Sequence, residues 1–324
     1  MTKYSLVLTC AAGATYAAGA TSAADATCAT GAASEPIITA QLANAIVEII
    51  DGTSPDWLAT NSACDIGFGA QNMPMDEAKA KLAQVRKKIG TQKIDANVIE
   101  TATRRKSLLV ADMESTIIEQ ECLDELADMV GLRPQIADIT ARAMQGELDF
   151  EAALQERVRL LKGLPESALQ KIYDERITMT AGAAALVATM RQNGAVCGLV
   201  SGGFSFYAEK IATHLGFDHW RSNHLQIKNS QLDGTVAKPI LGREDKAACL
   251  AEWQKTYQLA QSATMAVGDG ANDLAMLAGA GAGVAFHAKP RVAEIADICI
   301  NHSDLTALLY LQAYRAEQII QTMP

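Results

Sequence analysis

A set of charged, hydroxyl and glycine residues follows short apolar runs in the second half of the chain. Its members are Asp112, Glu114, Ser201, Gly202, Gly203, Asp269, Asn272 and Asp273, and Lys246 joins them from the start of a predicted helix between the second and third runs. Carboxylates brought together repel one another, and their pKa values rise unless a cation lies among them. Hard oxygen ligands beside a phosphate suit Mg²⁺, while a lysine, a hydroxyl and backbone N–H groups hold phosphate oxygens. The set therefore predicts phosphoryl transfer with Mg²⁺ as the cofactor.

The apolar runs that precede these residues are predicted strands of a parallel sheet. Ser107–Ala111, Ala195–Val200 and Thr264–Val267 have the length and the continuous apolar character of strands buried on both faces. Helical patterns lie between them, which predicts an α/β fold with a doubly wound (Rossmann-like), mostly parallel sheet. Ligands of such sheets bind beyond the carboxyl ends of the strands. We therefore expect the whole set to line one crevice.

Residues 117–180 form a predicted helical cap inserted between the first and second of these strands. Its expected helices are Ile117–Val130, Pro134–Gln145, Phe150–Lys162 and Pro165–Ile177. Such an insertion closes over a crevice and excludes water. The remaining residues divide into a small N-terminal α/β domain (1–103) and a catalytic core (104–116 and 181–324). Within the core, His224–Val236 is a predicted hairpin with its turn at Leu232–Gly234.

The third cap helix carries an arginine on its apolar side. At helical spacing, Phe150, Leu154, Arg157 and Leu161 share one face. Arg157 therefore points inward, whereas Arg159 projects about half a turn away toward solvent. A guanidinium can grip a carboxylate with two hydrogen bonds, which predicts an anion-binding role for Arg157. The alternative is a packed stem with its charged head in solvent.

The composition excludes several classes of function. A net charge of -9 and a pI near 5.1 disfavour surfaces that bind nucleic acid or anionic membranes. The seven cysteines are odd in number and form no CxxC pair, so neither a disulfide framework nor a zinc site is indicated, and a cytoplasmic location is expected. No segment is long and apolar enough to span a membrane. The apolar N-terminal run is better explained by a first strand, Tyr4–Thr9, than by a secretory signal.

The N-terminal domain holds predicted elements but no recognisable chemistry. Residues 10–34 are almost wholly Ala, Thr, Gly and Ser, which predicts a long loop. The later elements are a helix at Ile38–Ile50, a strand at Ala63–Phe68, a helix at Asp76–Ile89 and a strand at Asn97–Ala102. The residues of this domain alone therefore predict no function for it.

The catalytic set resembles the haloacid dehalogenase (HAD) superfamily, whose phosphatases use a DxDx[TV] strand end, a later Ser or Thr, a Lys and a GDxxxD signature. The stretches DMESTIIEQECLDELAD, VSGGF, GDGANDLAML and FHAKPRVAEIAD are similar to its phosphoserine phosphatase branch in particular. The similarity covers about residues 107 to 314. It implies a HAD-type core with a helical cap and Mg²⁺-dependent hydrolysis of O-phospho-L-serine, the last step of serine biosynthesis, through an aspartyl-phosphate. Family members often carry an ACT-like regulatory domain where residues 1–103 lie, but no such pattern is found there. The alternatives for this domain are that it forms a homodimer, that it binds serine, or that it does neither.

This resemblance also implies roles for individual residues. Asp112 would be the nucleophile, and Glu114 the acid that protonates the leaving oxygen and then activates water. Asp112, Asp269 and the main-chain carbonyl of Glu114 would hold Mg²⁺, with Asp273 and Asn272 supporting the metal and Lys246. The substrate contacts would come from Glu121, Met144, Phe150, Arg157, Ser201, Gly202 and Asn272. Among these, Glu121 matches the residue for the substrate amino group, and core packing is an equal alternative for Met144 and Phe150.

Position 114 departs from the family pattern, because it is Glu where Asp is expected. The two acids have similar ordinary pKa values, but Glu is longer by one methylene, which changes its reach to the leaving oxygen. Two alternatives to phosphoserine hydrolysis remain, and the glutamate bears on the second. One is a phosphatase or phosphotransferase acting on another small phosphate monoester, and the other is a catalytically weakened relative that binds a metabolite.

Overall fold

A computed structural model describes residues 2–11, 37–144 and 147–321, with the side chain of Met144 outside this description. The chain divides into two compact units. The first comprises Met1–Arg105 and Cys299–Ile319, and the second comprises Lys106–Ile298 and Ile320–Pro324. The loop predicted over residues 10–34 falls almost entirely outside the described residues. Within the described part, no helix has the length and apolar character needed to cross a membrane.

The first unit contains a four-stranded antiparallel sheet in a βαββαβ order. Its elements are β1 (Tyr4–Cys10), α1 (Ala40–Ile50), β2 (Asp56–Ala59), β3 (Ala63–Phe68), α2 (Met75–Ile89) and β4 (Ile94–Glu100). The strands lie in the order β2-β3-β1-β4. Alternate residues of β1, such as Leu6 and Leu8, pack in one core with Ile46 of α1 and Val85 of α2. The predicted helices and strands of this unit are confirmed, with β2 added and with β4 at Ile94–Glu100 instead of Asn97–Ala102.

The other face of this sheet is polar, and residues 299–319 contact it. Asp95 on β4 accepts hydrogen bonds from three successive backbone N–H groups, those of residues 301–303. Arg104, which follows β4, donates to two carbonyl oxygens of α12 (Ala307–Leu311). Asp95 and Arg104 are buried, so these hydrogen bonds pair their polar groups within the unit itself.

The second sheet has six strands and the predicted doubly wound topology. Its strands are β5 (Leu108–Ala111), β6 (Val196–Phe204), β7 (His219–Asn223), β10 (Thr264–Gly268), β11 (Ala282–Phe286) and β12 (Ile298–Ile300), in the order β12-β11-β10-β5-β6-β7. The pairs from β11 through β7 are parallel. The chain moves outward from β5 to β7 and then returns to β10 on the opposite side of β5. This reversal is the switch point at which such sheets bind ligands.

Helices of the second unit flank the sheet between its strands. They are α7 (Ala183–Gln192), α8 (Ser205–Leu215), α9 (Arg243–Thr256), α10 (Leu274–Gly279) and α11 (Pro290–Ala293). Helix α7 packs with α8, and α9 packs with α10. A Cβ atom at Gly198 of β6 would collide with the ring of Trp253 on α9, so glycine allows this helix to lie close against the strand.

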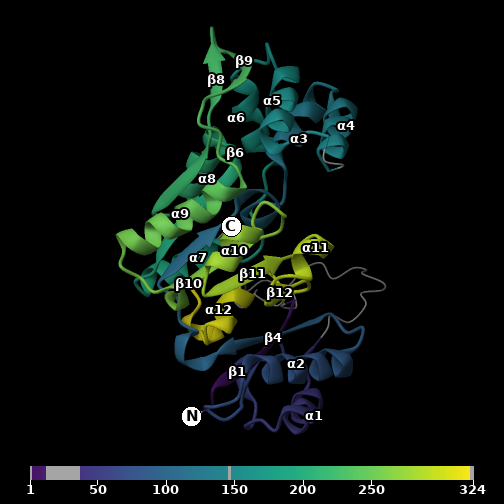
Figure 1. Ribbon diagram of the computed structural model, residues 1–324, viewed down its shortest axis with the longest axis vertical. Coiled ribbons are helices and arrows are strands. Elements are labelled where there is room, and N and C mark those ends of the chain that lie inside the picture. Colours follow the sequence, from purple (N-terminus) through teal and green to yellow (C-terminus); the bar gives the residue numbers. More distant parts are fainter. Residues whose placement is uncertain (1, 12–36, 145–146, 322–324) are drawn as a thin grey trace, which may run out of the picture. The chain divides into compact units, whose positions relative to one another are not determined.

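The predicted cap is present as four helices between β5 and α7. They are α3 (Cys122–Met129), α4 (Arg133–Met144), α5 (Phe150–Leu160) and α6 (Ser167–Arg176). These helices lie together with the β8–β9 hairpin (Leu225–Lys228 and Gln231–Val236), whose second strand packs on α5 (Figure 1). The predicted first helix, Ile117–Val130, was wrong at its start, because Ile118 has an extended backbone that pairs with Met179 and α3 begins only at Cys122. Residues 113–117, which precede it, form a tight turn in which Ser115 adopts a left-handed conformation with φ of 53°.

The hairpin is confirmed, but the predicted position of its turn was wrong. Asn229 and Ser230 both have positive φ angles, 53° and 58°, which is the pattern of a two-residue hairpin turn. Gly234 lies instead inside β9, also with a positive φ. A Cβ atom there would come within 2.9 Å of Lys162 Cβ, so this glycine permits close packing against the end of the third cap helix.

Candidate active site

Three carboxylates meet at the switch point of the sheet. Asp112 directly follows β5, and Asp269 follows β10, the neighbouring parallel strand. Asp273 lies four residues further on, and carboxylate oxygens of all three fall within 4.8 Å of one another. The three side chains are buried. This group could bind a metal ion, because clustered anionic oxygens removed from water need a cation among them.

The loop after β10 depends on two glycines. Gly268 and Gly270 approach the side chains of Asp273 and Asn272 so closely that a Cβ atom at either position would collide with them. The backbone N–H of Gly270 also donates to Asp273 Oδ2 at 2.9 Å. The sequence Gly268–Asp273 therefore folds its polar side chains back toward the end of β10, where Asn272 lines the cavity described below.

Lys246 lies between two of the carboxylates. It sits in the first turn of α9, is 1% exposed, and has its Nζ atom 2.7 Å from both Asp112 Oδ1 and Asp273 Oδ1. Burial opposes the lysine charge, but the contacts with the two carboxylates outweigh it and raise the pKa of Lys246. One lysine cannot neutralise three carboxylates. The remaining negative charge suits a divalent cation.

The same surroundings raise the pKa values of the carboxyl groups. Burial raises the pKa of Asp112 well above its ordinary value, with Asp273 adding to the effect and Lys246 opposing it. Burial also raises the pKa of Asp269 to about 6, although Lys289, with its Nζ 3.6 Å from Asp269 Oδ2, lowers it. The lysines of the protein therefore do not fully compensate the negative charge of these carboxylate oxygens.

Glu114 projects from the turn 113–117 toward the end of β6. Its Oε1 atom accepts a hydrogen bond from the backbone N–H of Cys122 at 2.8 Å. A Cβ atom at Gly203 would come 2.6 Å from Glu114 Oε2, so the carboxylate needs glycine at that position. Burial, together with the nearby charge of Glu121, raises the pKa of Glu114 to about 7. A carboxyl group with this pKa can both give and take a proton near neutral pH.

Ser201, Gly202 and Gly203 lie within the last part of β6 rather than after it, because the strand continues to Phe204. Ser201 is fully buried, and its Oγ atom accepts a hydrogen bond from the Gly203 N–H at 2.8 Å. Asn223 of β7 donates to the carbonyl oxygens of Gly202 and Leu241. These two hydrogen bonds connect the end of β6 with the segment before α9. No sequence signal marked Asn223 as part of the site.

A cavity of about 760 Å³ joins these groups to the cap. Of the predicted site residues, its lining includes Asp112, Glu114, Glu121, Phe150, Arg157, Gly202, Gly203, Asp269 and Asn272. Ser201, Lys246 and Asp273 are buried beneath this lining. Lys289 also lines it and was not predicted, although it stands in the FHAKP stretch. The predicted contact of Met144 concerns a side chain outside the described part.

Two cap residues of opposite charge face this cavity. Arg157 is half-buried, as its place on the inward face of α5 predicted, while Arg159 is exposed. Among the described residues, the side chain of Arg157 makes one hydrogen bond, from Nε to the Ala153 carbonyl oxygen. No carboxylate of these residues lies within 4.0 Å of the Arg157 guanidinium. Glu121 precedes α3, is exposed, and accepts a hydrogen bond from Ser115 Oγ at 2.8 Å. Arg157 thus has donors available for an anion.

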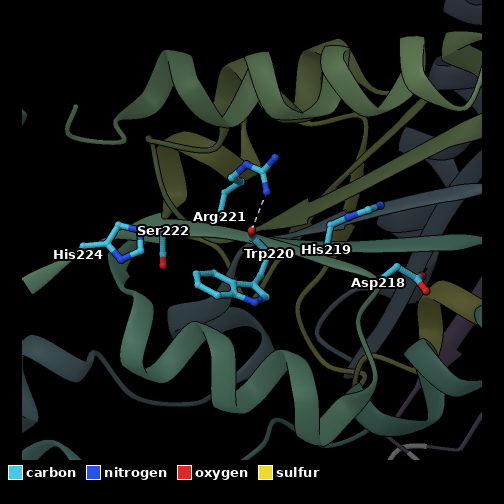
Figure 2. A pocket seen from close by; sticks show the side chains of 6 residues that line it. All are labelled: Asp218, His219, Trp220, Arg221, Ser222 and His224. Carbon is cyan, nitrogen blue, oxygen red and sulfur yellow. Dashed lines mark hydrogen bonds between the residues drawn. The ribbon is translucent and has the colours of Figure 1, made fainter. Parts of the chain in front are cut away.

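A second hollow of about 360 Å³ follows the edge strand β7. It is lined by Asp218, His219, Trp220, Arg221, Ser222 and His224. Figure 2 shows that Arg221 points to one side of the strand, whereas Trp220 and Ser222 point to the other. Asp218 is already paired with Arg191. These side chains do not converge on one point, so the larger cavity remains the candidate active site.

Comparisons with known proteins agree with this geometry. The family model for haloacid dehalogenase-like hydrolases matches residues 109–278. A phosphoserine phosphatase of Archaeoglobus fulgidus is 37% identical over 75% of this chain and 72% of its own length. One of Streptococcus thermophilus is 44% identical over 62% of this chain and 93% of its own length. A solved substrate-bound phosphoserine phosphatase matches with a TM-score of 0.59 and 39% identity, over 63% of this chain and 98% of that one. The chain belongs to the haloacid dehalogenase-like hydrolase family and, within it, to the phosphoserine phosphatases.

Proposed function

We propose that this chain hydrolyses O-phospho-L-serine to L-serine and phosphate, with Mg²⁺ as cofactor and Asp112 as the nucleophile. The observation that carries the proposal is the buried group of Asp112, Asp269 and Asp273 around Lys246 at the switch point of the sheet. Relatives named as phosphoserine phosphatases share 36–44% identity with the chain, which supports the choice of substrate.

The donor set fits a magnesium ion. Asp112, Asp269 and the main-chain carbonyl of Glu114 would hold it, with Asp273 and Asn272 in support. All are hard oxygen ligands, and the carboxylates carry more negative charge than Lys246 offsets. When bound, Mg²⁺ neutralises these carboxylates and the transferring phosphoryl group.

The residues then divide the reaction into two displacements. An ionised Asp112 oxygen attacks the phosphorus atom, and the bond from phosphorus to the serine oxygen breaks. Protonated Glu114 gives its proton to the departing oxygen, so that neutral serine leaves. Ionised Glu114 next takes a proton from water as the water oxygen attacks the phosphorus of the aspartyl-phosphate. Phosphate leaves, and both carboxyl groups return to their first protonation states.

Neighbouring groups bind the substrate during these steps. Gly202 and Asn272 line the cavity, and Ser201 is buried beneath it; the proposal assigns the phosphate oxygens to these three residues. Lys246, 2.7 Å from Asp112, would add positive charge there. The substrate carboxylate is assigned to Arg157 and its ammonium group to Glu121. Phe150, placed over Gly202, covers the site with its ring, since a Cβ atom at Gly202 would lie 3.3 Å from Phe150 Cζ.

The role of Arg157 makes a substrate-specific prediction. Arg157→Ala should lower the ratio of kcat/KM for phosphoserine to kcat/KM for an aryl phosphate by about 30-fold, because a charge-assisted contact to the carboxylate is lost. Phosphate release from both substrates measures this ratio. Arg159→Ala, an exposed neighbour on the same helix, is the control and should keep the wild-type ratio. Equal losses of Arg157→Ala on both substrates would refute the carboxylate role.

A further inference from the structure

One hydrogen bond connects the turn after the nucleophile to the cap. Ser115 lies three residues after Asp112, and its Oγ atom donates to Glu121 Oε1 at 2.8 Å. Its backbone is left-handed, with φ of 53°. Glycine adopts this conformation at lower cost than serine, so the backbone alone gives no reason for serine here. What serine adds at this position is the hydroxyl group.

Glu121 needs a restraint to face the cavity. It is exposed, and among the described residues the contact with Ser115 is the one hydrogen bond that its carboxylate makes. Its charge also acts unfavourably on Glu114, whose pKa it helps to raise. Solvation and this repulsion both favour a Glu121 side chain turned away into water, and a free glutamate loses rotamer entropy when it is held.

The hydroxyl group opposes this tendency without using up the carboxylate. Ser115 engages Oε1 and leaves Oε2 with its hydrogen-bonding capacity for a ligand. We propose that Ser115 is a positioning residue, which holds Glu121 ready for the ammonium group of the substrate and so favours phosphate esters that carry an amino group. This inference rests on the proposed function, since it assigns a source of specificity to that same site.

Two variants distinguish the effect of losing the Ser115 hydroxyl group from the effect of backbone strain. Ser115→Gly and Ser115→Ala both remove the hydroxyl, but only glycine relieves the left-handed conformation. Both should lower the ratio of kcat/KM for phosphoserine to that for an aryl phosphate by about tenfold, mainly through KM for phosphoserine, as expected for a lost hydrogen bond to a charged group. A wild-type ratio in Ser115→Gly would overturn the proposal, because the hydroxyl would then be dispensable.

A double-mutant cycle tests the connection to Glu121. Glu121→Gln should lower the same ratio, and adding Ser115→Gly to it should cause almost no further loss, because the carboxylate to be positioned is gone. Independent, multiplying losses would overturn the proposal. If Glu121→Gln lowers the ratio and Ser115→Gly does not, this inference alone fails. If the wild-type protein shows no preference for phosphoserine over the aryl phosphate, the proposed function fails as well.

Discussion

Replacing Glu114 by glutamine is expected to lower phosphoserine turnover by about a thousandfold, the usual scale of a general acid and base. Glutamine keeps the length of the side chain, and its amide oxygen can still accept the Cys122 N–H bond, but it has no carboxyl proton to give. Burial and the charge of Glu121 set the pKa of Glu114 at about 7, which suits both proton transfers. Steady-state phosphate release at neutral pH measures the loss.

Two comparisons make the result specific. The pKa of Glu114 is higher in the folded protein than in the unfolded chain. Ionisation of Glu114 therefore lowers the free energy of unfolding as the pH rises toward 7, and the full loss is reached above 7. Glu114→Gln should therefore be at least as stable as the wild type above pH 7, and its lost activity cannot come from unfolding. Glu114→Asp, which keeps the carboxyl group, should retain far more activity than Glu114→Gln. A near-normal rate in Glu114→Gln would remove Glu114 from acid–base catalysis.

Lys246→Met is expected to destabilise the protein by about 3–5 kcal/mol and to abolish measurable turnover, because it leaves two buried carboxylates without their partner. Lys246 is 1% exposed and lies 2.7 Å from both Asp112 and Asp273. Denaturant unfolding at pH 7 in metal-free buffer gives the change in the free energy of unfolding, and phosphate release gives the change in turnover.

Acid should partly reverse the loss of stability, since protonated carboxyl groups no longer need a cation. Burial and Asp273 already raise the pKa of Asp112, and removal of the lysine raises it further. The destabilisation should therefore shrink as the pH falls below 7. Lys255→Met, on the exposed side of the same helix α9, is the matched control and should lose little stability. A Lys246→Met protein as stable at pH 7 as this control would contradict the account of the buried ion pairs.

The positions of the candidate site residues could be predicted because parallel strands carry a strong local signal. Buried on both faces, β5 and β10 are continuous apolar runs, and the polar residue that follows each run stands out. The doubly wound order then brings Asp112 and Asp269 together without further information. Helical spacing likewise placed Arg157 on the inward face of α5.

Other features depend on contacts between distant residues, which periodicity does not encode. The predicted cap helix started too early, because Ile117 and Ile118 continue its apolar pattern, whereas the backbone of Ile118 is extended and α3 begins at Cys122. Strand β7 was missed, since His219–Asn223 is mostly polar and is held by pairing with β6. Asp95 and Asn97 of β4 look like surface residues, yet backbone groups of residues 299–303 bury and satisfy them.

The most direct test of the central claim is phosphate release from L-phosphoserine by the purified protein, with and without Mg²⁺. We expect release that EDTA stops and added Mg²⁺ restores, and none from a folded Asp112→Asn variant. No release by the folded wild-type protein supplied with Mg²⁺, or undiminished release by Asp112→Asn, would contradict the account.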